Sequence, residues 1–231
     1  MAKRFAGAMS AMANGIGSSA CFLAQGYPGS SIGDGSGKAV VVDVGGSRGN
    51  ISVALARAAP GLDFVVQDLA EVIQDVRKDI SAEVTERIEF MPHDFFMEQP
   101  VKADVYLFRN IFHNWSDAHV IKILKATIPA LRPGAHVLVN DVLLPEPGTL
   151  SWFKERHVWF ETPISPAFFY EKLTIRTRNM DMVMLSLFNS SERDEMCWKS
   201  LFQKADCRFS SIKAWVPEGA TLAIIDAIWE A

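Results

Sequence analysis

The sequence predicts a doubly wound α/β sheet with helices on both faces, and three observations carry this prediction. Short apolar runs rich in β-branched residues alternate with segments of helical spacing, and short connections join them. The first run, 39–44, is apolar almost throughout, as expected for a strand buried on both faces of a parallel sheet. Two strand-like runs near the end, 209–216 and 221–229, are separated by only four residues. Because four residues cannot hold a helical crossover, these two strands must pair antiparallel.

The predicted elements follow one another in the order that such a sheet requires. In chain order they are a helix over 6–21, a loop over 25–38, the strand 39–44, a helix from 51 to 59, strands over 63–67 and 87–91 with a helix over 70–78 between them, a strand over 105–108, a helix over 117–131, a strand over 136–142, helices over 166–188 and 191–204, and the final two strands. Proline and glycine punctuate these segments, as where Pro60 and Gly61 stop the first helix of the domain. The chain therefore divides into a helical lead and linker, 1–37, and one domain, 38–231.

The composition is that of a globular protein. Of 231 residues, 49% are hydrophobic and 22% charged, which excludes a disordered chain and a disulfide-stapled miniprotein. The 23 Lys and Arg against 27 Asp and Glu give a net charge of −4, which argues against a nucleic-acid binder. Three cysteines without a CxxC spacing (Cys21, Cys197 and Cys207) indicate a reducing compartment and no structural zinc. No apolar stretch has the length of a membrane span or forms a signal peptide, so we expect a cytoplasmic protein.

A glycine-rich turn follows the first predicted strand and is the first sign of a binding site. It reads Asp43-Val44-Gly45-Gly46-Ser47-Arg48-Gly49. Such glycines let the backbone turn sharply and approach a ligand, although a turn of this kind alone is often only a turn. Asp68 lies nineteen residues beyond Gly49, at the end of the next strand. An acid at about this offset can accept both hydroxyls of a ribose, so the pair predicts an adenosine-containing cofactor.

Two other classes of nucleotide-binding protein agree less well with the sequence. A dinucleotide fold requires G-x-G-x-x-G, whereas the glycines here fall at Gly45, Gly46 and Gly49. No tyrosine is followed four residues later by the lysine that a short-chain reductase needs, which disfavours a dehydrogenase. A Walker loop is excluded because the chain has no Gly-Lys-Ser/Thr.

Four motifs together resemble a known enzyme family. They are Asp43-Val44-Gly45-Gly46-Ser47-Arg48-Gly49, Gln67-Asp68-Leu69, His93-Asp94-Phe95-Phe96 and Arg109-Asn110-Ile111-Phe112-His113-Asn114-Trp115-Ser116-Asp117. Over roughly 5–231 the chain resembles the S-adenosylmethionine-dependent O-methyltransferases of the caffeic acid and flavonoid type, and most closely their fungal secondary-metabolite branch. The resemblance implies a Rossmann-like, seven-stranded methyltransferase sheet with an antiparallel final strand. That expectation agrees with the hairpin deduced from the spacing.

The resemblance also implies a set of residues that bind S-adenosylmethionine, without a metal. These cofactor-binding residues are Asp43, Gly45, Gly46, Asp68, Leu69, Asp94, Phe95 and Arg109. By family position, Gly45 lies against the methionine part, Asp68 holds the ribose hydroxyls, and Asp94 accepts from the adenine amino group. Arg109 stands where the family has a basic residue, usually lysine. Ser47 replaces the middle glycine of the turn and is expected to crowd it slightly.

The catalytic residues implied by the resemblance are one histidine and two acids. His113 matches the general base, and Asp141 and Glu192 match the acids that bracket it, with Asp141 in place of a glutamate and therefore shorter in reach. A neighbouring carboxylate stabilises the imidazolium that forms when the base takes a proton. Each of the three residues also has a non-catalytic alternative. His113 could be a core histidine whose hydrogen bonds are satisfied, Asp141 could be a structural hydrogen-bond acceptor, and Glu192 could stabilise the first turn of its own helix. Asp117 reads as a helix N-cap rather than a catalyst.

Substrate contacts are implied more loosely. The residues concerned are Asn114, which replaces a more usual aspartate, Met180, Met184 and Asn189. The aromatic stretch 152–170 and the methionines after it form either a pocket for a planar acceptor or ordinary helical core. His93, His119, His136 and His157 show no metal-ligand spacing.

The expected function is methyl transfer from S-adenosylmethionine to a hydroxyl, taken as phenolic, of an aromatic secondary metabolite. The alternative is a methyltransferase-like protein that binds the cofactor without transfer, such as a cofactor-assisted pericyclase or an assembly subunit. Family members carry an additional N-terminal domain that forms a homodimer and closes the acceptor pocket, whereas here a lead of 37 residues precedes the first strand. We therefore expect a weakened or altered homodimer, with weak acceptor affinity or an oligomer built from 6–21.

Overall fold

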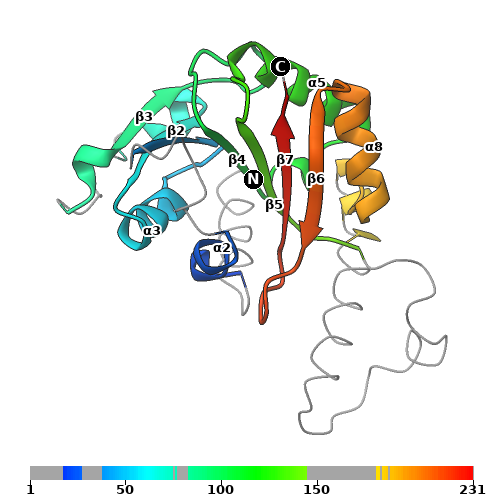
Figure 1. The fold of residues 1–231 in the computed structure, drawn as a ribbon, viewed down its shortest axis with the longest axis horizontal. Helices are drawn as coiled ribbons and strands as arrows, with labels where there is room; N and C mark the ends of the chain where they lie inside the picture. Colours follow the sequence, from blue (N-terminus) through cyan, green and yellow to red (C-terminus); the bar gives the residue numbers. More distant parts are fainter. Residues whose placement is uncertain are drawn as a thin grey trace, which may run out of the picture.

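A mixed sheet of seven strands forms the centre of the protein in this computed structural model, which describes residues 18–27, 38–74, 76, 83–144, 181–182, 184–186 and 188–230 (Figure 1). The strands are β1 (Ala39–Val44), β2 (Leu62–Asp68), β3 (Ile88–Pro92), β4 (Val105–Arg109), β5 (His136–Asp141), β6 (Phe209–Trp215) and β7 (Ala223–Trp229). Their order across the sheet is β3-β2-β1-β4-β5-β7-β6, and β1 to β5 are parallel where they pair. Only β7 runs antiparallel, to both β5 and β6, so the predicted hairpin is confirmed.

Helices cover both faces of this sheet. They are α2 (Ala20–Gly26), α3 (Asn50–Ala58), α4 (Ala70–Ile73), α5 (Asp117–Thr127) and α8 (Glu195–Ala205), with 3₁₀ turns η3 (Thr85–Arg87), η4 (Phe112–Asn114) and η5 (Ile128–Ala130). In Figure 1, α2 and α3 lie together on one side of the sheet, and α8 lies on the other. The helix expected over 6–21 has most of its length outside the described residues, and α2 extends into the expected loop. Of the helix expected over 166–188, the described residues begin at 181 and are helical there.

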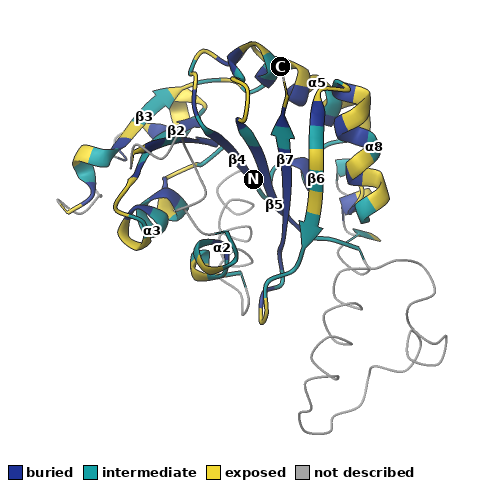
Figure 2. Cartoon of the chain, in the orientation of Figure 1, coloured by how far each residue is buried: buried dark blue, intermediate teal, exposed yellow. Residues whose placement is uncertain are grey.

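Each face of the sheet has its own apolar core, because successive strand residues point to opposite faces. Val42 and Tyr106 pack into a cluster with α5 and α8, whereas Val41 and Leu107 pack into a cluster with α2 and α3. Figure 2 shows the inner strands buried along most of their length, whereas the edge strands β3 and β6 carry exposed positions and the helices keep exposed outer faces. Each fully buried large apolar side chain, such as Trp198, contributes about 1.5–3 kcal/mol to folding.

The start of α5 differs from the prediction by one residue. Its N-cap is Ser116, in extended backbone, and Asp117 is the first helical residue. The Asp117 carboxylate instead lies 2.9 Å from an Nη of Arg193, which is almost fully buried. The N-cap prediction for Asp117 was therefore wrong. Ser116 holds that position, and the Asp117 carboxylate forms an ion pair with Arg193, which is distant in the chain and which the local pattern does not reveal.

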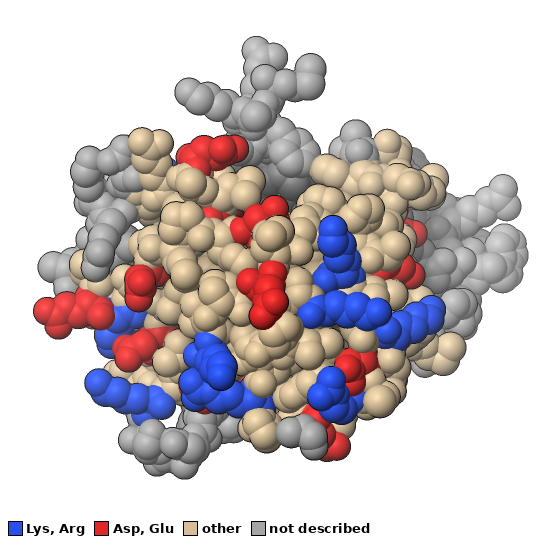
Figure 3. Space-filling view, turned by 90° about the horizontal axis from the view of Figure 1, so that it is seen from above, with Lys and Arg blue, Asp and Glu red and all other residues tan. Residues whose placement is uncertain are grey.

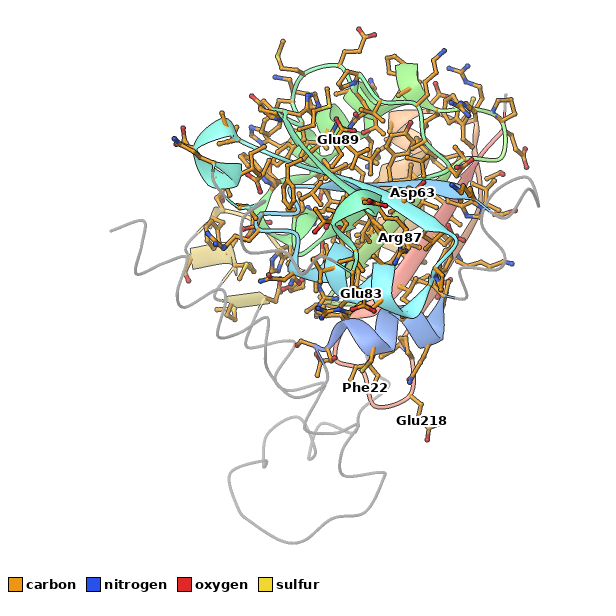
Figure 4. The ribbon with its side chains drawn as sticks, turned by 90° about the vertical axis from the view of Figure 1, so that its left-hand side faces the viewer. Phe22, Asp63, Glu83, Arg87, Glu89 and Glu218 are labelled. Atoms are coloured by element: carbon orange, nitrogen blue, oxygen red, sulfur yellow. The ribbon has the colours of Figure 1, made fainter. Side chains whose placement is uncertain are left out.

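Helix α2 is fastened to the sheet at both of its ends. Near its start, the hydroxyls of Ser18 and Thr221 lie 3.1 Å apart. Beyond its end, the Tyr27 hydroxyl lies 2.8 Å from Nδ1 of His136, a residue of β5. Figure 4 shows Phe22 of α2 beside Glu218 of the β6–β7 turn. The segment 18–27 therefore packs against the sheet next to the final hairpin.

The surface carries both signs of charge. Figure 3 shows Lys and Arg side chains among Asp and Glu side chains on one face, with uncharged surface between them. Among the described residues, no helix is long and apolar enough to cross a bilayer. The same residues contain no group of three or more His, Cys, Asp or Glu that could hold a metal ion.

Candidate active site

The turn between β1 and α3 requires glycine for a steric reason. Gly45 has a φ of +73°, and the amides of Gly45 and Gly46 both donate to the Gln67 carbonyl, at 2.8 and 3.0 Å. A Cβ on Gly46 would lie 2.6 Å from Cγ of Asp43 and 2.8 Å from Cγ1 of Val66. Both neighbours are buried, so neither has room to move. The structure thus shows close packing of the turn against its own neighbours, and the approach of its backbone to a ligand stays a prediction.

The Asp68 carboxylate is held at the end of β2 by two backbone amides. Its Oδ2 accepts from the Ser47 amide at 2.9 Å, and its Oδ1 accepts from the Leu69 amide at 2.8 Å. An ionised carboxylate has about four acceptor sites, and these two amides are the partners that Asp68 has among the described residues. Ser47 reaches Asp68 with a φ of 53°, a left-handed conformation that costs about 1–2 kcal/mol in a residue with a Cβ. The serine that replaces the middle glycine thus keeps the shape of the turn at a conformational cost.

Asp43 is a buried carboxyl beneath the glycine turn. Its Oδ2 accepts from the Ser52 hydroxyl at 2.6 Å, and 2% of the residue is exposed. Burial raises the pKa of Asp43 to about 6, against the opposing effects of the Ser52 hydrogen bond and the positive charge of Arg109.

We expect Asp43→Asn to stabilise the protein at pH 8 by about 1–3 kcal/mol. The folded-state pKa lies above the ordinary 3.8, so the native state binds the extra proton, and stability falls as the pH rises from about 4 to 6. Asparagine takes no part in that titration and carries no charge to bury. Urea unfolding at pH 4 and pH 8 measures both effects. An unchanged or lower stability of the variant at pH 8 would contradict the expectation.

Phe95 lies beside the glycine turn, and Asp94 precedes it in the segment that follows β3. A Cβ on Gly45 would lie 3.8 Å from Cε1 of Phe95, so the half-buried ring faces the turn directly. Asp94 is exposed, and its Oδ1 accepts from the Phe96 amide at 3.0 Å. Leu69 is 47% exposed beside Asp68. The carboxyl ends of β1, β2 and β3 thus present a glycine turn, an apolar ring and two acids at one edge of the sheet.

Arg109, at the end of β4, makes hydrogen bonds within the protein. Its guanidinium donates to the Asn140 side chain and to the Ser18 carbonyl, which precedes α2. Burial lowers its pKa, while Asp43 and Asp141 oppose that shift. Arg109 thus joins β4, β5 and the segment leading into α2, and its role toward a cofactor stays a prediction.

His113 lies in η4, the turn that follows β4. The residue is 8% exposed, and its Nδ1 lies 3.4 Å from Oε1 of Glu192. Burial by itself would lower the pKa of His113, but the charges of Asp141 and Glu192 and the hydrogen bond to Glu192 raise it above the ordinary 6.5. The structure therefore brings the predicted base and both predicted acids together.

The two acids hold His113 in different ways. Glu192 faces the ring, whereas Asp141 Oδ2 accepts from the backbone amide of His113 at 3.3 Å. The second oxygen of Asp141 is buried and has no hydrogen-bond partner among the described residues. Burial raises the pKa of Asp141 to about 6. The shorter aspartate therefore reaches the backbone of His113, and the longer glutamate reaches its ring.

Glu192 does not serve the first turn of a helix. The helix α8 begins at Glu195, and its N-cap is Asp194, whose Oδ1 accepts from the Cys197 amide at 2.7 Å. Glu192 is 4% exposed, and its own amide donates to Oδ1 of Asp181 at 2.7 Å. Its side chain is therefore free of helix capping and points to His113.

We expect Asp141→Asn and Glu192→Gln each to lower the pKa of His113, because each removes a neighbouring negative charge. The double variant should bring this pKa below 6.5, since burial is then the main remaining influence. Histidine NMR titration measures the shift of the His113 resonance in each variant against the wild type. A His113 pKa that stays in place in both single variants would contradict this account.

The predicted substrate residues are only partly described. Asn114 is half-buried, and its Nδ2 donates to the Asn110 carbonyl at 3.0 Å. Met184 is buried, Asn189 is exposed with a φ of 50°, and Met180 lies outside the described residues. The aromatic stretch 152–170 lies outside them as well. Contact of these residues with a substrate stays a prediction.

Three residues at the site were missed from the sequence. Asp181 binds the Glu192 amide, and Ser190 and Arg193 bind carbonyls of the turn that carries His113. Nothing in the local pattern distinguishes them from surface polar residues. Their position close to Glu192 in the chain was the only available signal.

Comparison with known proteins identifies the family. The sequence model of the O-methyltransferase domain matches residues 34–156. The chain is 47% identical over 231 residues to the grayanic acid biosynthesis cluster O-methyltransferase of Cladonia grayi, covering 99% of this chain and 46% of that protein. It is 38% identical over 232 residues to the chlorophenol O-methyltransferase of Trichoderma longibrachiatum, covering 99% and 45%. The crystal structure of TnmH matches with a TM-score of 0.74 at 26% identity, over 98% of this chain and 57% of TnmH. The chain spans about half the length of the curated relatives it matches, and within that span it belongs to the O-methyltransferase domain family, with that family's seven-stranded sheet.

Proposed function

We propose that the protein transfers a methyl group from S-adenosylmethionine to a phenolic hydroxyl of an aromatic secondary metabolite, with His113 as general base. One observation carries this proposal: a buried histidine between two carboxylates follows β4, and the glycine turn follows β1. β1 and β4 are adjacent and parallel, so their carboxyl ends share one edge of the sheet. A base and a nucleoside site at one edge are what such a transfer requires.

The residues present fit S-adenosylmethionine. Bound there, it supplies a methyl group on a sulfonium centre with a good leaving group. Asp68 keeps acceptor capacity that the described residues do not use and that ribose hydroxyls could take, and Phe95 offers an apolar ring beside Gly45. A Cβ at Gly45 or Gly46 would collide with Ile111 or with Asp43, so the glycines are what allow the turn to keep its present course. The protein's own tasks are then to orient the acceptor and to take its proton.

Proton removal is the step in which His113 matters. A phenol with a pKa of ~10 facing an ordinary histidine at ~6.5 is uphill by about 5 kcal/mol. The pKa of His113 is raised by Asp141 and Glu192, which narrows that gap. Glu192 at Nδ1 also orients the ring, so that the opposite nitrogen is the one that accepts the proton.

The acceptor class is supported by the names of two relatives. The Trichoderma protein is named for a chlorophenol, and the Cladonia protein for a biosynthesis cluster. The first name points to an acceptor that carries a hydroxyl on an aromatic ring, and the second to a role in biosynthesis. An ionisable phenol also suits a histidine base better than an aliphatic alcohol, whose pKa is several units higher.

The test is binding followed by transfer. Calorimetric titration with S-adenosylmethionine should show one site, and a methyl-release assay should show transfer to members of a phenol panel that includes chlorophenols. Aliphatic alcohols and aromatic amines serve as matched acceptors that should stay unmodified. Cofactor binding without transfer to any phenol would favour a pericyclase or an assembly subunit over the proposed function.

A further inference from the structure

The turn that carries His113 is held by side chains from a distant part of the chain. Arg193 is 2% exposed, and its Nη1 donates to the Phe112 carbonyl at 3.0 Å. Its Nη2 donates to the Trp115 carbonyl at 2.7 Å, and its Nε donates to Oδ1 of Asp117 at 3.0 Å. One guanidinium thus bonds the residue before His113, a residue after it and the first residue of α5.

Ser190 completes these contacts at His113 itself. Its hydroxyl lies 2.6 Å from the His113 carbonyl and 3.0 Å from the Trp115 carbonyl, and 3% of the residue is exposed. Asp141 accepts from the His113 amide on the other side. The two peptide groups that flank the His113 Cα are therefore each tied to a buried side chain.

The same short segment also delivers the acid that faces the ring. Glu192 stands between Ser190 and Arg193 in sequence, and the Arg193 carbonyl accepts from the Leu144 amide at 2.9 Å, just beyond β5. One segment therefore sets the backbone of His113 and the partner of its ring relative to each other. A shift of the turn would change the separation between Nδ1 and Glu192 directly.

We propose that Ser190 and Arg193 form a carbonyl clamp that positions His113 for proton transfer, with Arg193 as its main positioning residue. This inference rests on the proposed function of His113 as the base. A planar guanidinium donates to two carbonyls and a carboxylate at once, whereas a lysine ammonium is a point donor without that fork. Loss of the fork leaves buried carbonyls unpaired and lets the turn move.

Arg193→Lys tests the clamp with the charge retained. We expect kcat for methyl transfer to fall by roughly 10- to 100-fold, because small misplacement of a reacting group has that effect. The KM for S-adenosylmethionine should change much less than kcat, because Ser190 and Arg193 make no hydrogen bond to a predicted cofactor residue within the described part of the chain, although Trp115 packs against Phe95. Histidine NMR should show a lower pKa for His113 as its contact with Glu192 loosens.

Arg87→Lys is the matched control. Arg87 also donates to backbone carbonyls, those of Ala56, Ala59, Pro60 and Leu62. Figure 4 shows it near Asp63 and Glu83. Arg87 precedes β3 at the amino ends of the parallel strands, whereas η4 follows the carboxyl end of β4. Its replacement should lower the melting temperature without changing kcat or the pKa of His113.

Three results would decide the matter. If Arg193→Lys matches wild type, or if Arg87→Lys changes kcat and the pKa of His113 equally, the clamp is refuted. If Arg193→Lys does not fold, Ser190→Ala provides the same readouts, and an unchanged kcat and pKa there refute it too. If the wild type transfers no methyl group, the proposed function fails, whereas the His113 titration in the three proteins still shows whether the clamp positions the ring.

Discussion

His113→Gln is expected to lower kcat for methyl transfer by about 10²- to 10⁴-fold, the usual contribution of a positioned general base. Glutamine is near the size of histidine and can still hydrogen-bond to Glu192, but it cannot take a proton at neutral pH. Affinity for S-adenosylhomocysteine should be unchanged, because the glycine turn, Asp68 and Phe95 belong to other elements. Paired calorimetry and single-turnover assays separate the two effects.

His119→Gln is the control for that experiment. His119 is exposed in the first turn of α5, and its Nδ1 lies 2.8 Å from the Ser116 hydroxyl, so it shares neither acid with His113. Its variant should turn over like the wild type. The role of His113 as a base would be refuted if both variants kept full activity. It would also be refuted if His113→Gln lost cofactor binding and activity in proportion.

Gly46→Ala is expected to abolish cofactor binding and to lower stability by about 1–3 kcal/mol or more, the cost of overpacking. The new Cβ would lie 2.6 Å from both Cγ and Oδ2 of Asp43, and Val66 blocks the other direction at 2.8 Å. The only remedy is movement of the turn, which carries the amide of Ser47 away from Asp68. Thermal unfolding and titration with S-adenosylhomocysteine measure the two losses.

Gly134→Ala separates steric crowding from backbone strain. Gly134 has a φ of +81°, and a Cβ there would meet nothing within 4 Å. Its replacement should cost about 1 kcal/mol from the left-handed backbone alone and leave cofactor affinity intact. Equal effects of the two alanines on affinity would show that the close approach at Gly46 is not what shapes the site.

Local pattern was a good guide to the sheet and to the glycine turn. Strand positions followed from β-branched runs, and the antiparallel end of the sheet followed from the four residues before Thr221, because chain geometry permits no other connection. Asp68 was placed by its offset from Gly49, since consecutive parallel strands end at the same edge. Such inferences need only neighbours in sequence.

Elements that depend on distant contacts were predicted less well. The local pattern predicts Asp117 as an N-cap, yet the Asp117 carboxylate accepts a hydrogen bond from Arg193, 76 residues later in the chain. The segment before β1 reads as a loop from residue 25, yet α2 continues to Gly26 and Tyr27 bonds His136, 109 residues on. In each case the side chain bonds a residue far away in the chain, which the local pattern does not reveal.

By itself, then, the sequence determined the α/β architecture, the glycine turn, the position of Asp68 at the end of β2 and the family of motifs around His113. Only the tertiary structure shows which part of His113 each acid contacts: Asp141 accepts from its backbone amide, and Glu192 faces its ring. It alone also revealed Ser190 and Arg193 around the turn. The physical reason is that hydrogen bonds between residues some 80 positions apart leave no periodicity in the chain, because only the folded sheet brings their donors and acceptors within reach.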